Sequence, residues 1–107
     1  MDTQHAVLVV SAEVIPGKDD EFNSWYDEHH IPSFSSKMPH LKSIRRYYSK
    51  KSNPQSIAIY EYSTMDELKI SLASKESEDA GKDADAQLGK LVKSFTYNRY
   101  LQTHSTG

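Results

Sequence analysis

The first third of the chain carries two distinct hydrophobic patterns. Residues 6–15 (AVLVVSAEVI) form an apolar run rich in β-branched side chains and stop at a Pro-Gly pair, which predicts a strand followed by a turn. Residues 18–30 carry three acids in their first turn and then repeat aromatic side chains at helical spacing, which predicts an amphipathic helix. Pro32 disfavours helical torsions at the preceding residue, so we expect this helix to end near Ile31.

The middle of the chain predicts a hairpin and a second helix. Residues 41–50 (LKSIRRYYSK) and 56–63 (SIAIYEYS) are strand-like and flank the polar turn KSNPQ. Thr64 and Glu67 then have the spacing of a capping box, and apolar side chains follow on one helical face. A helix is therefore expected to begin at this point.

The last third of the chain is more polar. Residues 75–85 (KESEDAGKDAD) hold five acids and two lysines around Gly81, which predicts a polar interruption before a short helix that ends near Val92. Residues 94–101 (SFTYNRYL) alternate as the last strand. The order is strand, helix, strand, strand, helix, strand.

This order, in a chain of 107 residues, predicts one α+β domain spanning residues 1–107. The expected architecture is a ferredoxin-like sandwich (βαββαβ), in which two helices cover one face of a four-stranded antiparallel sheet. Large side chains alternate onto both faces of the predicted strands, so the second face also needs a cover. We expect that cover to be a second copy of the chain, which predicts a homodimer with sheet packed on sheet.

Composition narrows the function classes. The formal net charge is −2 and residues 56–63 lack the Gly-aromatic pattern of an RNA-recognition motif, so no nucleic acid partner is expected, although the run RRYYSKK interleaves arginine and tyrosine. The absence of cysteine excludes disulfides and thiolate chemistry. The N-terminal apolar run is preceded by an acid and is too short to span a bilayer, so we expect no membrane partner and a cytoplasmic location.

The stretch EFNSWYDEHHIP (residues 21–32) holds the candidate chemistry. Phe22 and Trp25 are expected in the core, whereas His30 stands at the predicted helix end with Tyr26 four residues before it. An imidazole suits acid–base catalysis, so His30 is the predicted acid or base, and His29 is expected to face away from any pocket because neighbouring helix residues diverge by about 100°.

Tyrosines are expected to position a ligand oxygen beside His30. Tyr26 is placed with His30 in the catalytic pair, and four further side chains are predicted to bind ligand: Trp25, Tyr47, Tyr60 and Tyr62. A metal site built from His29 or His30 with His40 and an acid is the weaker alternative, because the i, i+4 histidine pair is missing. No cofactor and no metal are therefore expected.

FNSWYDEHHIP, followed by PHLKSIRRY, resembles the signature of the EthD-like branch of the dimeric α+β barrel superfamily. The positions that match the motif are Trp25, Tyr26, His30, Pro32, Arg46 and Tyr47. The resemblance implies a homodimer whose two sheets form a barrel, with a pocket in each protomer between the helices and the inner sheet face. Members are associated with small aromatic and ether compounds, and some act as cofactor-independent cyclases, dehydratases or monooxygenases.

Two function classes follow from these observations. The first is a cofactor-independent enzyme acting on a phenolic or polyketide-like compound, with His30 as acid or base and Tyr26, Tyr60 or Tyr62 holding an oxygen. The second is a non-catalytic protein that binds a small apolar ligand. The sequence shows no carboxylate recognisably paired with His30, so it does not separate the two.

Overall fold

The structure, a computed structural model, describes residues 4–106. One antiparallel sheet has the strand order β2-β3-β1-β4. Its strands are β1 (Ala6–Val14), β2 (Ser43–Tyr48), β3 (Ser56–Tyr62) and β4 (Val92–Leu101). The helical segments are α1 (Asp19–Ser24), η1 (Trp25–His30), α2 (Ile31–Phe34), α3 (Met65–Leu72) and α4 (Lys75–Leu88). The predicted α+β ferredoxin-like sandwich is confirmed.

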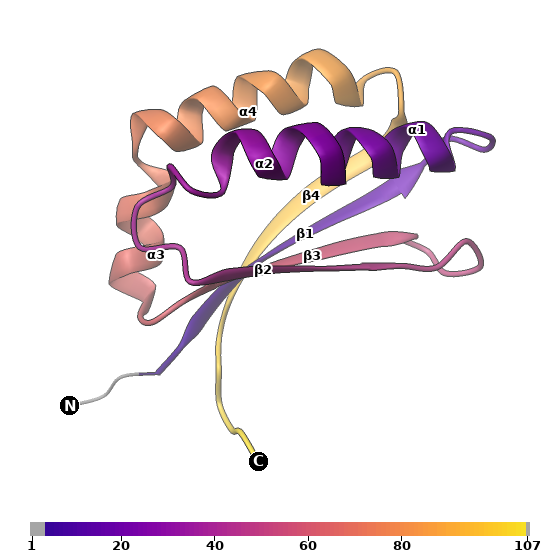
Figure 1. The fold of residues 1–107 in the computed structure, drawn as a ribbon. Coiled ribbons are helices and arrows are strands. Elements are labelled where there is room, and N and C mark those ends of the chain that lie inside the picture. Colours follow the sequence, from indigo (N-terminus) through magenta and orange to yellow (C-terminus); the bar gives the residue numbers. More distant parts are fainter. Residues whose placement is uncertain (1–3, 107) are drawn as a thin grey trace.

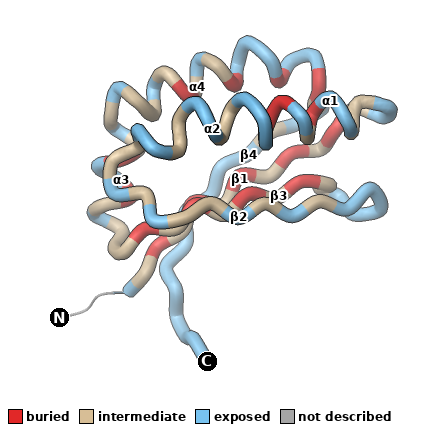
Figure 2. The backbone as a smooth tube through the Cα atoms, in the orientation of Figure 1, coloured by how far each residue is buried: buried red, intermediate tan, exposed pale blue. Residues whose placement is uncertain are grey.

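All helical segments lie on one side of the sheet (Figure 1). The run α1–η1–α2 and the antiparallel α4 lie over the sheet, and α3 lies near one end. Burial alternates along β1 and β3, so every second side chain enters the layer beneath the helices (Figure 2). Phe22 is fully buried there and Trp25 almost so, which confirms the prediction that both belong to the core.

The first helix does not end near Ile31, and that prediction was wrong. The chain stays helical through Phe34, with Pro32 in the first turn of α2. Residues of η1 form a π-helix, and the Ile31 N–H bonds the Tyr26 carbonyl five residues earlier. Proline lacks an N–H and is tolerated in a first turn, so the change of hydrogen-bond pattern just before Pro32 accommodates it.

The predicted interruption around Gly81 was also wrong, because α4 is one helix of 14 residues. The Ser74 hydroxyl caps it by accepting a hydrogen bond from the Ser77 N–H at 3.1 Å. Ala80, Ala84 and Leu88 are buried on one side of this helix. Burial of that side against the rest of the domain stabilises a segment whose composition alone is too polar to predict a helix.

The predicted start of a helix at Thr64 is confirmed. Thr64 has extended torsions and its hydroxyl accepts a hydrogen bond from the Glu67 N–H at 3.1 Å. Leu68 is fully buried, and Met65 and Leu72 pack against the core. No helix within residues 4–106 is long and apolar enough to cross a membrane.

We expect Thr64→Ala to lower the free energy of unfolding by about 1 kcal/mol, because one backbone N–H of α3 loses its capping acceptor. Urea denaturation measures the change. Thr103→Ala, at an exposed position after the last strand, is the control and should alter stability by less than about 0.5 kcal/mol. Equal stabilities of the two variants would contradict a capping role for Thr64.

In the part of the chain that the structure describes, no helix lies over the second face of the sheet (Figure 1). The register places Val9 beside Ile59 and Tyr47 beside Ile57 on this face, and Val7 beside Tyr100. Tyr47 is 55% exposed and Tyr100 is 53% exposed. We call this surface the outer face; its apolar members are Val7, Val9, Tyr47, Ile57, Ile59 and Tyr100.

Candidate active site

A cavity of about 230 Å³ lies between the sheet and the helices, and we call it the inner cavity. Its side chains with polar groups are Tyr26, His30, Tyr60, Ser77 and Tyr97. The remaining lining is provided by Leu8, Val10, Met38, Leu72, Ala80, Gly81, Ala84 and Phe95. Ligand sites in proteins commonly combine a mostly apolar wall with a few convergent polar groups, and the inner cavity has this composition.

His30 lines the inner cavity together with Tyr60, as predicted for its position, while His29 lines a separate groove on the outside of the helices. The π-helix places them in this way. Its i→i+5 pattern brings His30 onto the side of Trp25, whose ring centroid is 4.7 Å from that of His30. The Tyr26 ring meets His30 edge-on at 5.5 Å. These two rings hold the imidazole in one orientation.

A carboxylate from α4 completes this arrangement. Asp83 Oδ2 lies 2.9 Å from His30 Nδ1, and the His30 side chain is 12% exposed. A carboxylate oxygen accepts hydrogen bonds, so the contact assigns a ring proton to Nδ1 and leaves the lone pair of a neutral imidazole on Nε2. No residue within 4–106 hydrogen-bonds Nε2. His30 therefore has the form of an oriented general base.

The Tyr26 and Tyr60 hydroxyls form a buried pair with an O···O distance of 2.8 Å. One hydroxyl donates to the other, so one O–H of the pair remains available to donate to a ligand oxygen. Burial raises the pKa of Tyr26 to about 12, against the smaller opposing effects of the Tyr60 hydrogen bond and Arg46. Burial also raises the pKa of Tyr60 well above its ordinary value. Both phenols are therefore protonated donors near neutral pH.

Arg46 supports this pair from β2. Its guanidinium carbon lies 4.4 Å from the Tyr26 ring centroid, in cation–π contact. The two terminal nitrogens bond Asp27, Asn23 and Ser56 at 2.8 to 3.0 Å. Nε is buried and has no partner among the described residues. Arg46 thus ties β2 and β3 to the first helical run and holds Tyr26 in place.

The raised pKa of Tyr26 predicts an alkaline loss of stability. Because the folded-state pKa of about 12 exceeds the ordinary value of 10.0, the stabilisation is complete below about pH 10 and is lost as pH rises towards 12. The free energy of unfolding of the wild type should fall between pH 8 and pH 11. In Tyr26→Phe we expect this fall to be smaller by about 1 kcal/mol. Urea denaturation at both pH values measures it. An identical fall in the wild type and the variant would contradict the assignment.

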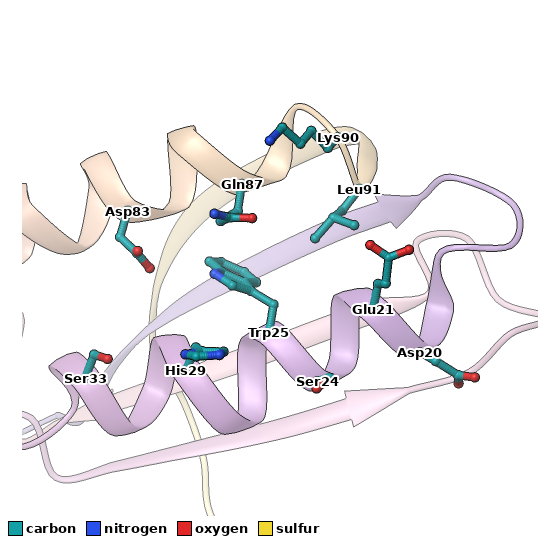
Figure 3. A pocket seen from close by; sticks show the side chains of 10 residues that line it. All are labelled: Asp20, Glu21, Ser24, Trp25, His29, Ser33, Asp83, Gln87, Lys90 and Leu91. Carbon is teal, nitrogen blue, oxygen red and sulfur yellow. The ribbon is translucent and has the colours of Figure 1, made fainter.

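A groove on the solvent side of the helical layer lies between the run α1–η1–α2 and α4 (Figure 3). It encloses about 600 Å³, and we call it the outer groove. Trp25 and Asp83 point into it from opposite sides, and His29 lies along its edge (Figure 3). Asp83 therefore borders the outer groove, on the solvent side of the helical layer. Its partner His30 borders the inner cavity, between the helices and the sheet.

The structure separates the predicted ligand-binding residues. Tyr60 lines the inner cavity and Trp25 lines the outer groove. Tyr62 is fully buried, and its hydroxyl pairs with that of Ser71 at 2.8 Å, so it lines neither space. Tyr47 alternates onto the outer face of the sheet. Strand alternation explains this placement of Tyr47, because its neighbours Arg46 and Tyr48 point to the helical side.

The alternative metal arrangement is not assembled. His40 lies 3.5 Å from Glu67 on α3, whereas His30 pairs with Asp83 on α4. Among residues 4–106, no group of three or more histidine, aspartate or glutamate side chains is positioned to hold a metal ion.

Sequence reasoning missed Asp83, which lies 53 residues after its histidine. The signal that could have found it was the helical spacing of the small residues Ala80 and Ala84 within the acidic segment. A continuous helix through this segment places Asp83 beside the buried stripe, at its edge. Because the acidic residues were interpreted as an interruption of the helix, the position of Asp83 beside the buried side chains was not predicted.

Solved structures with the same fold were found, whereas no protein-family model and no curated protein matches the sequence. An EthD family protein of Bacillus halodurans has a TM-score of 0.73 and 20% identity, covering 94% of this chain and 99% of its own. A candidate antibiotic biosynthesis monooxygenase of Caulobacter crescentus has a TM-score of 0.69 and 16% identity, with coverages of 95% and 92%.

A third similar structure, from Bacteroides fragilis, is described as a dimeric protein of unknown function with a ferredoxin-like fold. Its TM-score is 0.64 at 15% identity, with coverages of 92% of this chain and 96% of its own. Together these likenesses place the chain among proteins with the fold of the EthD family. The resemblance drawn from FNSWYDEHHIP is confirmed at the level of the fold.

Proposed function

We propose that this protein is an enzyme that transfers a proton on a small, largely apolar compound bearing a carbonyl or phenolic oxygen. One observation carries the proposal. His30, oriented by Asp83 through Nδ1, lines the same cavity as the protonated Tyr26–Tyr60 pair, and its Nε2 has no hydrogen-bond partner among the described residues. A base and an oxygen-binding donor in one mostly apolar cavity are the components of acid–base catalysis.

The proposed step begins with His30 Nε2 taking a proton from a carbon next to the ligand carbonyl. The electron pair of the broken C–H bond moves to the carbonyl oxygen, and the free hydroxyl of the tyrosine pair donates to the resulting oxyanion. Asp83 stabilises the imidazolium that forms. The proton is then returned to carbon or to a departing hydroxyl.

Deprotonation of this kind can begin a cyclisation, a dehydration or an oxygenation. These are the reaction types implied by the EthD-like resemblance, and the similarity to a candidate antibiotic biosynthesis monooxygenase supports a small-molecule role. The residues described above supply the proton transfer that the three reactions share. They do not distinguish between them.

The second candidate is a binding protein without chemistry. The apolar lining of the inner cavity favours it, because burial of apolar surface alone can hold a small ligand. In this role His30 and the tyrosine pair would orient the bound oxygen and move no proton.

Deuterium exchange separates the candidates. The wild-type protein is incubated in deuterated buffer with resorcinol or phenylacetone, which are one-ring compounds with slowly exchanging carbon-bound protons, and exchange is followed by NMR. Exchange faster than in buffer supports the enzyme. Saturable binding without faster exchange supports the binding protein. If a library of one-ring phenols, ketones and lactones shows neither, the inner cavity is not the functional site.

We further propose that the protein forms a homodimer through the outer face. No helix of residues 4–106 covers the apolar side chains of this face, and the Bacteroides fragilis protein with the same fold is described as dimeric. A two-fold axis through the sheet would pair Val9 and Ile59 of one copy with the same region of the other.

A further inference from the structure

Gly81 is an unusual residue for its position in the middle of α4. Glycine in a helix interior lowers stability relative to alanine, because it loses more backbone freedom on folding. Two common structural reasons for such a glycine are absent. Its φ does not lie in the positive range that favours glycine, and a Cβ built on it would meet no atom within 4 Å. Neither the backbone nor close packing therefore requires it.

The space beside Gly81 is the inner cavity. Gly81 shares one side of α4 with Ser77, Ala80 and Ala84, at helical spacings of three and four residues, and all four line the cavity. His30 and the tyrosine pair lie in the same lining. Any side chain at position 81 would project from the helix towards the volume in which a ligand must meet these groups.

The inner cavity is partly open to solvent, so its volume limits the part of a ligand that it can enclose. A cavity of about 150 Å³ accepts benzene. The inner cavity, at about 230 Å³, exceeds this by roughly 80 Å³, which at the benzene share of about 25 Å³ per carbon is room for a substituent of about three heavy atoms. A second fused ring adds four carbons, about 100 Å³ on the same share, so part of a fused two-ring compound would project from the open side of the cavity.

We propose that Gly81 determines substrate size, and that the substrate is a compound with one six-membered ring and a small substituent. This inference rests on the proposed function of the inner cavity and selects its phenolic alternative over a polycyclic polyketide. Because Gly81 has no side chain, the ring of the substrate has enough room to place its oxygen at the Tyr26–Tyr60 pair and a carbon at His30.

Calorimetric titration with phenol, 4-ethylphenol and 2-naphthol tests the inference. We expect the wild type to bind both one-ring phenols and to bind 2-naphthol at least tenfold more weakly. Gly81→Ala should weaken 4-ethylphenol binding by about 5- to 150-fold, because an added methyl group overpacks the filled cavity, and should change phenol binding less. Gly81→Leu should abolish binding of all three compounds.

Folding of the variants is checked by their melting temperatures. Gly81→Ala should raise Tm by roughly 3 to 8 °C through its higher helix propensity, so weaker binding cannot be attributed to unfolding. Gly89→Ala is the matched control, since a Cβ there also meets no atom within 4 Å but the residue lies outside the inner cavity. Its affinities should equal those of the wild type.

Two results would overturn the inference. They are 2-naphthol binding as tightly as phenol, and an unchanged 4-ethylphenol affinity in Gly81→Ala. Either can occur while His30-dependent proton exchange persists, in which case the proposed function stands and the size limit fails. Conversely, the predicted affinities without any proton exchange would leave the size limit standing for a binding protein.

Discussion

Replacing His30 by glutamine is expected to slow proton exchange on a bound one-ring compound by roughly 10²- to 10⁴-fold, the usual contribution of a positioned acid or base. Glutamine keeps a polar side chain of similar reach but has no group that accepts and returns a proton near neutral pH. The affinity for the compound should change much less, because most of the cavity wall is apolar and stays in place. NMR exchange rates and calorimetric affinities measure the two effects separately.

His29→Gln is the matched control for this prediction. The substitution is the same and lies one residue away, but His29 lines the outer groove, so the exchange rate should remain within about twofold of the wild type. Asp83→Asn should give a loss intermediate between these two variants, because an amide does not stabilise the imidazolium as a carboxylate does. Equal rates in the His29 and His30 variants would exclude His30 as the base.

Ile59→Glu is expected to convert the proposed homodimer into a monomer. Ile59 lies near the middle of the outer face, beside Val9 and Arg45. Two-fold symmetry would bury two new carboxylates in the interface, each at a desolvation cost of several kcal/mol. In the monomer the carboxylate would instead face water next to the Arg45 guanidinium, so the fold should be retained.

Sedimentation velocity at micromolar concentration distinguishes the two assemblies by mass. Ile70→Glu is the control, since Ile70 is 54% exposed on α3, on the helical side of the sheet, and this variant should remain a dimer. A wild-type protein with the mass of one chain, or an Ile59→Glu variant with the mass of two, would contradict assembly through the outer face.

Local patterns were sufficient to predict most of the architecture. The apolar run of β1, the polar turn between β2 and β3, and the Thr64 cap each act within a few residues, so their effects can be read from neighbouring positions. The same is true of Phe22 and Trp25, whose spacing on a helix predicts their burial. The placement of His30 on the inner cavity was also anticipated, although the π-helix that produces it was not.

The errors arose at two segments whose conformation is decided by bonds or contacts that form only on folding. The acidic residues of α4 discourage a helix on their own, and burial of Ala80, Ala84 and Leu88 against the core stabilises one. Pro32 continues a helix because the hydrogen-bond pattern changes just before it. In both cases the deciding contacts or bonds are formed only in the folded chain.

The sequence by itself determined the order of the elements, the amphipathic character of the first helix and the histidine that lines the inner cavity. Tertiary structure alone decided that Asp83 orients this histidine, that Tyr60 rather than Tyr62 or Tyr47 reaches the cavity, and that Gly81 borders it. The physical reason is that periodicity records which side of an element faces the interior. Which side chains pair across that interior depends on how the helices and strands are placed relative to one another, and packing sets that placement.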